Sequence, residues 1–299
     1  MSAPEISVVM AAGNAAGTVE ACLHSLERQP LFASTEVIVA DCSTDGTDRL
    51  IRRRFPGVQL LHYDSPTGLP EMLRDALALA KGRIVAVAEP HCIFAEDWLE
   101  KLRQSHESEF AVIGGAVENG CPDGTMSWAC FLADYGAFML PAERHVAREL
   151  AGNHISYKRA LIREALPQIK DGYWKVFFLR DLEQRGLPFL FEPSLVVYLM
   201  GRKTLGVFLR DYFEHGWFFA SMLSRRISRP ARLARVLASP LLPPLHLYRR
   251  LRDALGKRRH TGKLLEAIPL LAVFVTVWSA GEFMGYLLGP NHLPREAYR

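Results

Sequence analysis

Residues 37–47 constrain the fold of this chain most strongly. A short apolar run, rich in β-branched residues, ends abruptly at Asp41 and gives way to a loop of acidic residues, hydroxyl residues and Gly46. Short continuous apolar runs are typical of parallel strands that are buried on both faces. Open α/β sheets bind ligands beyond the carboxyl ends of their strands. The stretch therefore predicts a parallel strand followed by a ligand-binding loop.

Strand and helix patterns alternate through the first hundred residues. Strands are expected at 6–10, 36–40, 58–63 and 83–88, and helices at 18–28, 48–55 and 68–80, the last of them ended by Gly82. This alternation predicts a parallel sheet with right-handed crossovers. Beyond it, strands are expected at 111–116, 152–157 and 189–198, helices at 159–165 and 177–185, and an irregular connection over 121–145.

The size and the cysteine content set broad limits. A chain of 299 residues is long enough for one large α/β domain with an appendage. Its five cysteines are scattered and odd in number, which favours free thiols in a reducing compartment over a disulfide framework. The first residues lead directly into a strand pattern, so no signal peptide is expected.

The charge is distributed unevenly along the chain. Residues 225–259, called the basic segment below, contain eleven Lys or Arg residues against the single acid Asp253, a net charge of +10. Because the whole chain carries +4, the remainder carries −6. A basic block can bind nucleic acid or an anionic membrane, and the apolar stretches beside this one favour the membrane. No nucleic-acid partner is expected.

An apolar stretch at 264–289 follows the basic segment. Its longest uninterrupted run, 267–281, has only 15 residues, whereas a clean membrane-spanning helix needs about 20. A buried core helix, an interfacial or re-entrant membrane segment and a true span all remain open. Prolines at 240, 243 and 244 exclude one regular helix through 236–248.

The loop at 41–47 has the form Asp-x-Ser-x-Asp-Gly-Thr and resembles the nucleotide-sugar-binding loop of family 2 glycosyltransferases. Other residues of the chain match that family in the same order. The resemblance implies a GT-A fold, a nucleotide-diphospho-sugar transferase-like α/β domain with a mixed, mainly parallel sheet, over residues 1–200. The basic and apolar region 201–299 is then expected to be helical and membrane-associated.

The resemblance also implies a function. The expected enzyme transfers a sugar, with inversion, from a nucleotide sugar to a membrane-associated acceptor such as a lipid carrier or glycolipid. A UDP-sugar is the favoured donor. The expected location is the cytoplasmic face of the inner (plasma) membrane. Two rivals remain: a non-catalytic nucleotide-sugar-binding protein, and a membrane-bound scaffold.

Five residues match the nucleotide side of the family site. Asp41 can accept a hydrogen bond from a uracil imide or a ribose hydroxyl, or can form a simple Asx turn. Asp45 is expected to shape the same loop. Ala11 and Asn14 lie in the family's first nucleotide-contacting loop, or in a plain βα turn. Arg74 can face the nucleotide or its phosphates, or lie on a solvated helix face.

The metal motif departs from the family pattern. Family members end the fourth strand with Asp-x-Asp, which holds a divalent metal on the sugar diphosphate. Here Glu89 and His91 occupy the two acidic positions. A carboxylate and an imidazole can hold Mn²⁺, and less readily Mg²⁺. The alternative is that Glu89 stabilises the loop and no metal binds.

The position of the catalytic base departs as well. The family's Asp lies eleven residues before a helix-ending Gly, and counting back from Gly186 reaches Lys175. An ordinary lysine is protonated and cannot act as a base, so Asp171 is the candidate, with a turn role or an altered activity as alternatives. Asn153 and His154 resemble the acceptor-side segment and are candidates for contact with the sugar or the acceptor.

Overall fold

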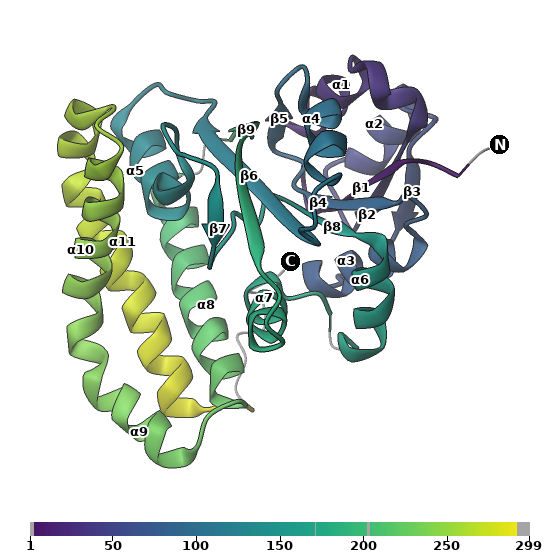
Figure 1. Cartoon of the computed structure of the whole chain (residues 1–299). Helices are drawn as coiled ribbons and strands as arrows, with labels where there is room; N and C mark the ends of the chain where they lie inside the picture. Colours follow the sequence, from purple (N-terminus) through teal and green to yellow (C-terminus); the bar gives the residue numbers. More distant parts are fainter. Residues whose placement is uncertain (1–2, 171, 202–203, 292–299) are drawn as a thin grey trace. The chain divides into compact units, whose positions relative to one another are not determined.

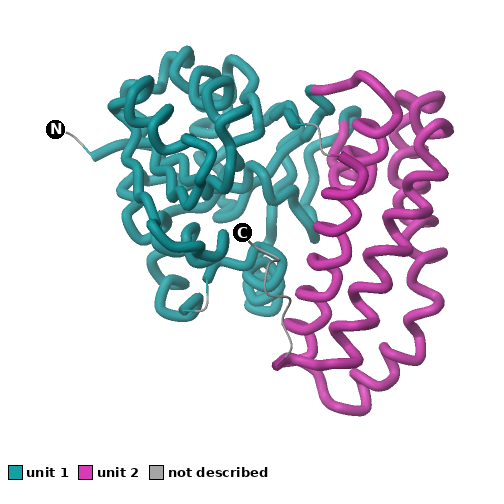
Figure 2. The backbone as a smooth tube through the Cα atoms, turned by 180° about the vertical axis from the view of Figure 1, so that it is seen from behind, with its two compact units in different colours: residues 1–120, 140–201, 298–299 teal, residues 121–139, 202–297 magenta. Residues whose placement is uncertain are grey.

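The computed structural model describes residues 3–170, 172–201 and 204–291, and it divides the chain into two compact units (Figure 2). The described residues of the α/β unit lie in 3–120 and 140–201. Those of the helical unit lie in 121–139 and 204–291. The sequence places a boundary at 200, and the structure in addition assigns 121–139 to the helical unit. The two units are described separately.

The α/β unit is built on a mixed sheet, as predicted. Its parallel part has the order β3-β2-β1-β4 and comprises β1 (Ile6–Ala12), β2 (Thr35–Asp41), β3 (Gln59–His62) and β4 (Ile84–Ala88). The interiors of β1, β2 and β4 are buried, which explains their continuous apolar sequences. All four strands lie where the sequence predicts them.

The rest of the sheet mixes strand directions. It comprises β5 (Cys92–Phe94), β6 (Val112–Asn119), β7 (His145–Ala147), β8 (His154–Lys158) and β9 (Phe189–Leu199). Strand β8 runs antiparallel to β4 and β6, and β9 runs parallel to β6 but antiparallel to β5 and β7. The register of β9 against β6 shifts between Gly115 and Ala116, opposite Pro193. The irregularity accommodates a proline that a regular ladder would exclude.

Helices flank the strands of the α/β unit. They are α1 (Val19–Glu27), α2 (Thr47–Arg54), α3 (Leu69–Leu79), α4 (Trp98–Ser105), α6 (Arg159–Ala165) and α7 (Lys175–Gln184), with short 3₁₀ turns at Pro30–Ser34 and Leu166–Gln168. Figure 1 shows α1 and α2 on one side of the parallel strands and α3 and α6 on the other. Each helix buries an apolar stripe, for example Val19, Cys22, Leu23 and Leu26 of α1.

Two expectations about local structure are wrong. Gly82 does not cap α3, because that helix ends at Leu79 with Ala80 as its cap. Gly82 is needed instead for a close approach to β1. A Cβ atom there would lie 2.5 Å from the Ser7 nitrogen, and its N–H donates to the Ser7 hydroxyl. The connection over 121–145 is not irregular either, since it contains α5 (Thr125–Asp134) and most of it belongs to the helical unit.

The helical unit contains α5, α8 (Leu205–Ser224), α9 (Arg229–Ala238), α10 (Leu242–Gly256) and α11 (Thr261–Leu288), with 3₁₀ turns η2 (Gly136–Phe138) and η4 (Ser239–Leu241). Prolines 240, 243 and 244 lie in η4 and the first turn of α10, so the expected break in the helix is confirmed. Helix α11 packs against α8, α5, α10 and α9.

Glycines allow α8 and α11 to approach closely. A Cβ atom on Gly216 of α8 would lie 2.3 Å from the Trp278 carbonyl oxygen. A Cβ atom on Gly281 of α11 would lie 2.1 Å from the Phe213 carbonyl oxygen. Neither backbone can move away without separating the helices, so these positions require glycine.

Among the described residues, α11 alone is long and apolar enough to cross a membrane, with a mean hydropathy of 1.8 over its most apolar 18 residues. Of that window, 39% is buried inside the protein. Length and composition by themselves do not distinguish a spanning helix from the core helix of a soluble bundle.

We expect Gly281→Ala to lower the free energy of unfolding by about 1–3 kcal/mol, because the added methyl group overpacks the α8–α11 contact. The matched control is Gly262→Ala in the same helix, where a Cβ atom meets nothing within 4 Å. That change should be neutral or raise stability by up to about 1 kcal/mol. Thermal or urea unfolding measures both, and equal stabilities would contradict the close-packing argument.

Candidate functional site

Chain segments from five parts of the α/β unit meet at one edge of the sheet. The parallel strands β1, β2, β3 and β4 end there, with Ala12 beside Asp41 and Asp41 beside His62 in the strand register. Strand β8 runs the other way, so its first residue, His154, pairs with Ala88 at the end of β4. The edge therefore brings together the loops predicted to bind nucleotide, metal and acceptor.

The loops after β1 and β2 are tied together by hydrogen bonds. The Asn14 side-chain oxygen accepts from the Thr44 N–H at 3.0 Å, and the Asn14 N–H donates to the Ser43 hydroxyl at 2.8 Å. The Ala16 N–H donates to the Asp45 carboxylate at 3.0 Å. Asn14 has a φ of 54°, a left-handed conformation that asparagine tolerates better than most residues. Asn14 and Asp45 thus order each other's loops.

Asp45 organises its own loop as well. Its carboxylate accepts from the Thr47 hydroxyl at 2.6 Å and from the Thr47 N–H at 3.1 Å. Desolvation acts to raise the pKa of Asp45, but these hydrogen bonds, with that from Ala16, outweigh it and hold the pKa below its usual value. The side chain thus has the loop-shaping contacts that the sequence suggests.

Asp41 is fully buried at the end of β2. One carboxylate oxygen accepts from the Ser43 hydroxyl at 2.5 Å, and the other lies 2.9 Å from the Nδ1 atom of His62. His62, at the end of β3, is partly exposed and was missed by the sequence reasoning. The sequence did contain a signal for His62, because it lies near the end of the predicted strand that follows the strand ending at Asp41. Ala11, also named by the sequence, lies in β1 beside Ala40 of β2.

The Arg74 side chain is hydrogen-bonded to other residues of the protein. Its guanidinium donates to the Asp75 carboxylate at 2.8 and 2.7 Å and to the Lys170 carbonyl at 2.6 Å. The Tyr63 hydroxyl donates to the other Asp75 oxygen at 2.9 Å. Desolvation, followed by the Asp75 carboxylate, raises the pKa of Tyr63 to about 12, so this hydroxyl stays protonated. Arg74 therefore connects α3 to the chain segment before residue 171.

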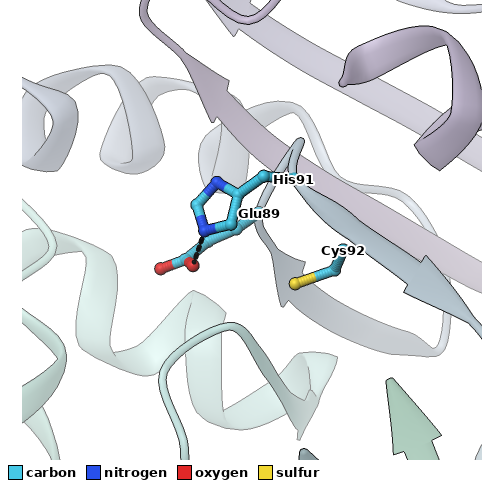
Figure 3. A group of neighbouring side chains, drawn as sticks. All are labelled: Glu89, His91 and Cys92. Atoms are coloured by element: carbon cyan, nitrogen blue, oxygen red, sulfur yellow. Dashed lines mark ion pairs between the residues drawn. The ribbon is translucent and has the colours of Figure 1, made fainter. Parts of the chain in front are cut away.

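Glu89, His91 and Cys92 form a cluster after β4 (Figure 3). One potential ligand atom from each lies within 4.8 Å of the others, and the His91 Nε2 atom is 2.9 Å from a Glu89 carboxylate oxygen. Glu89 and His91 are partly exposed, whereas Cys92 is buried. The structure thus brings together the two predicted metal ligands and adds Cys92, which the sequence reasoning did not select.

The donor atoms of this cluster fit a divalent transition ion. Carboxylate oxygen and imidazole nitrogen are ligands that Mn²⁺ accepts, while Mg²⁺ prefers oxygen alone. Burial raises the pKa of the Cys92 thiol well above its ordinary value, and the Asn153 side-chain amide lies 3.6 Å from its sulfur. Glu89 and His91 are therefore the residues of the cluster best suited to hold a metal.

Asn153 and His154 lie beside this cluster and are buried. The Asn153 side-chain oxygen has no hydrogen-bond partner among the residues that the structure describes, and the only polar groups near the buried His154 ring are the backbone groups of Gly115 and Ala116 and the Glu89 carboxylate. Burial lowers the pKa of His154 to about 4, against the opposing effect of nearby backbone groups and Glu89, so the ring is neutral at neutral pH. Buried polar atoms without partners are rare and are suited to binding a ligand.

Lys175, which the sequence resemblance aligns with the family's catalytic Asp, is the first residue of α7. Its ammonium donates to the Leu150 carbonyl at 3.1 Å. Its side chain passes Gly152, where a Cβ atom would lie 3.2 Å from the lysine Cδ and Cε atoms. Lys175 therefore lies next to the segment that carries Asn153 and His154. Asp171, the candidate base, lies outside the described residues.

The comparisons with known proteins assign the class. Residues 7–169 match the family described as "Glycosyl transferase family 2". Since the match covers more than half of the chain, the chain belongs to glycosyl transferase family 2. The resemblance seen in the sequence is thereby confirmed. No curated protein matches the chain.

Solved structures share the fold. The mannosyltransferase PcManGT from Pyrobaculum calidifontis, in complex with GDP-Man and Mn²⁺, is 18% identical, with a TM-score of 0.56 over 96% of this chain and 86% of its own. TarS 1–349 from S. aureus, in complex with UDP-GlcNAc, is 15% identical, with a TM-score of 0.54 over 93% and 92%. Another structure of TarS 1–349 is 16% identical, with a TM-score of 0.51 over 72% of this chain and 64% of its own, which is less than two thirds of that chain. These likenesses confirm the GT-A-like α/β fold with a helical C-terminal region.

We expect acid to destabilise the protein partly through Asp45. Because the folded-state pKa of Asp45 is lowered, its contribution to stability is present above the unfolded-state pKa and is lost as the pH falls through the folded-state pKa. Asp45→Asn should therefore give a shallower decrease of unfolding free energy towards low pH than the wild type. Urea unfolding over a pH series measures this, with Asp48→Asn in the same segment as control. Parallel profiles for wild type and Asp45→Asn would contradict it.

Proposed function

We propose that the α/β unit transfers a sugar from a nucleotide sugar, with UDP-sugar the favoured donor, to a membrane-associated acceptor. The observation that carries the proposal is the meeting of the strand-end loops, the Glu89–His91–Cys92 cluster and the buried Asn153 and His154 at one sheet edge. This edge belongs to a domain of glycosyl transferase family 2. Turnover of a radiolabelled UDP-sugar with membranes as the acceptor source tests the proposal.

The donor side rests on the ordered loops after β1 and β2. We assign Ala11, Asn14, Asp41, Asp45 and Arg74 to the nucleotide side, with Asp41 acting on the base together with His62. The buried Asp41 carboxylate fixes the orientation of the partly exposed imidazole, and a fixed imidazole can present its other nitrogen to a ligand. The related folds include proteins in complex with GDP-Man and with UDP-GlcNAc, so the fold accommodates either nucleotide.

In this proposal Glu89 and His91 hold a divalent metal, Mn²⁺ rather than Mg²⁺. Such an ion would supply positive charge to the sugar diphosphate as the diphosphate leaves. The His91 Nε2 atom and a Glu89 carboxylate oxygen now interact with each other. This pair would have to open before both atoms could bind the ion. PcManGT was solved with Mn²⁺ in its complex, which supports the same choice here.

The acceptor side rests on Asn153, His154 and Asp171. An inverting transfer needs a base to take the proton of the acceptor hydroxyl as it attacks the anomeric carbon, and Asp171 is our candidate. Asn153 and His154, which lie beside Glu89 and Cys92, are our candidates for contact with the sugar or the acceptor.

A non-catalytic nucleotide-sugar-binding protein is the second candidate function. The specific observation in its favour is Lys175, an amine at the position of the family's carboxylate, with its ammonium on the Leu150 carbonyl. A protonated ammonium cannot accept the acceptor's proton. Nucleotide binding without turnover, in a preparation with suitable membranes, would favour this candidate over the transferase.

The proposed location is the cytoplasmic face of the inner membrane, with a membrane lipid or lipid-linked molecule as the acceptor. The +10 charge of the basic segment supports it. Lysine and arginine near an anionic leaflet each contribute about 1 kcal/mol of attraction.

Asp41→Asn should weaken UDP binding by about 1.5–3 kcal/mol, or roughly 10- to 150-fold, because a charge-assisted interaction is lost while the side-chain shape is kept. Isothermal titration calorimetry measures the change. His62→Gln should weaken binding too if Asp41 acts through the imidazole. Asp48→Asn, on the adjacent helix, is the control and should bind as the wild type does. Unchanged UDP affinity in folded Asp41→Asn would remove Asp41 from the site.

Glu89→Gln should abolish any increase in UDP affinity caused by Mn²⁺, because the amide is a poor ligand in place of a carboxylate. Glu96→Gln, an exposed acid seven residues further along, is the matched control and should keep the Mn²⁺ effect. Both are measured by titration of UDP with Mn²⁺ and with EDTA. Equal UDP affinity of the wild type in Mn²⁺ and in EDTA would show that the metal assignment is wrong.

A further inference from the structure

Helix α9 has no buried residue, although it carries several large apolar side chains. Leu233 is 60% exposed and Leu237 is 73% exposed. Most helices in proteins are stabilised by packing of an apolar face. Helix α9 packs against α11, yet its two leucines remain exposed, so they indicate a partner beyond the contacts within the chain.

The exposed apolar residues continue beyond α9. Leu241 in η4 is 68% exposed, Leu245 in α10 is 40% exposed, and Tyr248 is 63% exposed. From Leu233 onward these residues recur every three or four positions, through α9, the 3₁₀ turn η4 and α10. Figure 1 shows α9 and α10 following one another beside α11. We call Leu233, Leu237, Leu241, Leu245 and Tyr248 the leucine face.

The leucine face lies within the basic segment. Arg229 and Arg249, which border it in the sequence, are exposed, as is Arg225 before α9. Only Asp253 among residues 225–259 is acidic, and it pairs with Arg252 at 2.7 Å. Apolar and cationic side chains on the same short helices are typical of helices that lie in a membrane interface, with the apolar residues in the acyl boundary and the cations at the headgroups.

Helix α11, in contrast, has protein partners along its length. Its buried residues include Leu264, Leu271, Phe274 and Tyr286. Glu282 is only 5% exposed; it accepts a hydrogen bond from the Trp278 indole at 2.6 Å and lies 3.2 Å from His246 of α10. A carboxylate with partners inside the bundle favours α11 as the core helix of the helical unit over a helix that crosses the bilayer alone.

We propose that the leucine face is a membrane-docking surface that lies in the plane of an anionic lipid bilayer, and that α11 does not span it. This inference rests on the proposed function only in taking a membrane as the site of action. A second copy of the chain is disfavoured as the occupant, because two segments of charge +10 repel each other. Nucleic acid would satisfy the arginines but would leave the leucines exposed to water.

The test is cosedimentation of the full-length protein with vesicles of phosphatidylcholine, with and without phosphatidylglycerol. The docking variant is Leu233→Gln/Leu237→Gln/Leu241→Gln, since glutamine keeps helix propensity while removing apolar surface. The matched control is Leu265→Gln/Val273→Gln/Leu287→Gln, which changes three apolar residues of α11 that are 60%, 45% and 50% exposed. Circular dichroism and thermal unfolding check that each variant is folded.

We expect the wild type and the α11 control to bind vesicles that contain phosphatidylglycerol. The docking variant should bind them more than about tenfold more weakly, a difference of about 1.4 kcal/mol. Salt at about 1 M, where the Debye length is about 3 Å, should weaken wild-type binding without abolishing it, because the leucines remain inserted.

Three results would overturn the proposal. The first is loss of binding by the α11 control with unchanged binding by the docking variant, which would assign insertion to α11. The second is the absence of binding to either vesicle type by the wild type, including the case in which the wild type self-associates in solution and the docking variant does not. The third is that duplex DNA releases the wild type from the vesicles and that the docking variant binds the vesicles as strongly as the wild type does. None of these readouts depends on catalysis, so a failed transferase assay would leave them interpretable.

Discussion

The buried carboxylate of Asp41 is the constraint on which the candidate site depends. A charged group removed from water must be paired and hydrogen-bonded, and Asp41 is fully buried. Its partners are the Ser43 hydroxyl and the His62 imidazole, so the loop after β2 and the end of β3 adopt defined positions. Ser43 in turn accepts from the Asn14 N–H, which orders the loop after β1. One acid at a strand end thus organises three strand-end segments.

The part of the site that depends on this acid was also the part most visible in the sequence. Strands β1, β2 and β4 are continuous apolar runs, and Asp41, Asn14 and Asp45 follow them within a few residues. His62 was missed because its significance comes from pairing with Asp41 on a neighbouring strand 21 residues earlier. The helix α5 was missed because its apolar residues are buried against α11, about 130 residues further along the chain. Local periodicity does not report such contacts.

Both departures from the family pattern make the candidate site less negatively charged. In the assignment proposed above, Glu89 and His91 stand where the family has two acids, and Lys175 stands where it has the catalytic carboxylate. In that proposal each exchange removes negative charge from the region that receives an anionic diphosphate. The repulsion that a metal ion would offset is then smaller than in a site of two carboxylates. A donor diphosphate should consequently need the metal less for binding here than with an Asp-x-Asp motif.

The chain connectivity links the α/β unit to the helical unit. The segment 121–139 leaves the α/β unit after β6, supplies α5 to the helical unit and returns before β7. Trp128, Phe131 and Leu132 of α5 are buried, and α5 packs against α11. A chain that ended at residue 201 would expose these side chains, so truncation would not yield a clean α/β domain. No residue of α9 is part of the buried core. Point substitutions on α9 therefore separate membrane docking from sugar transfer better than truncation does.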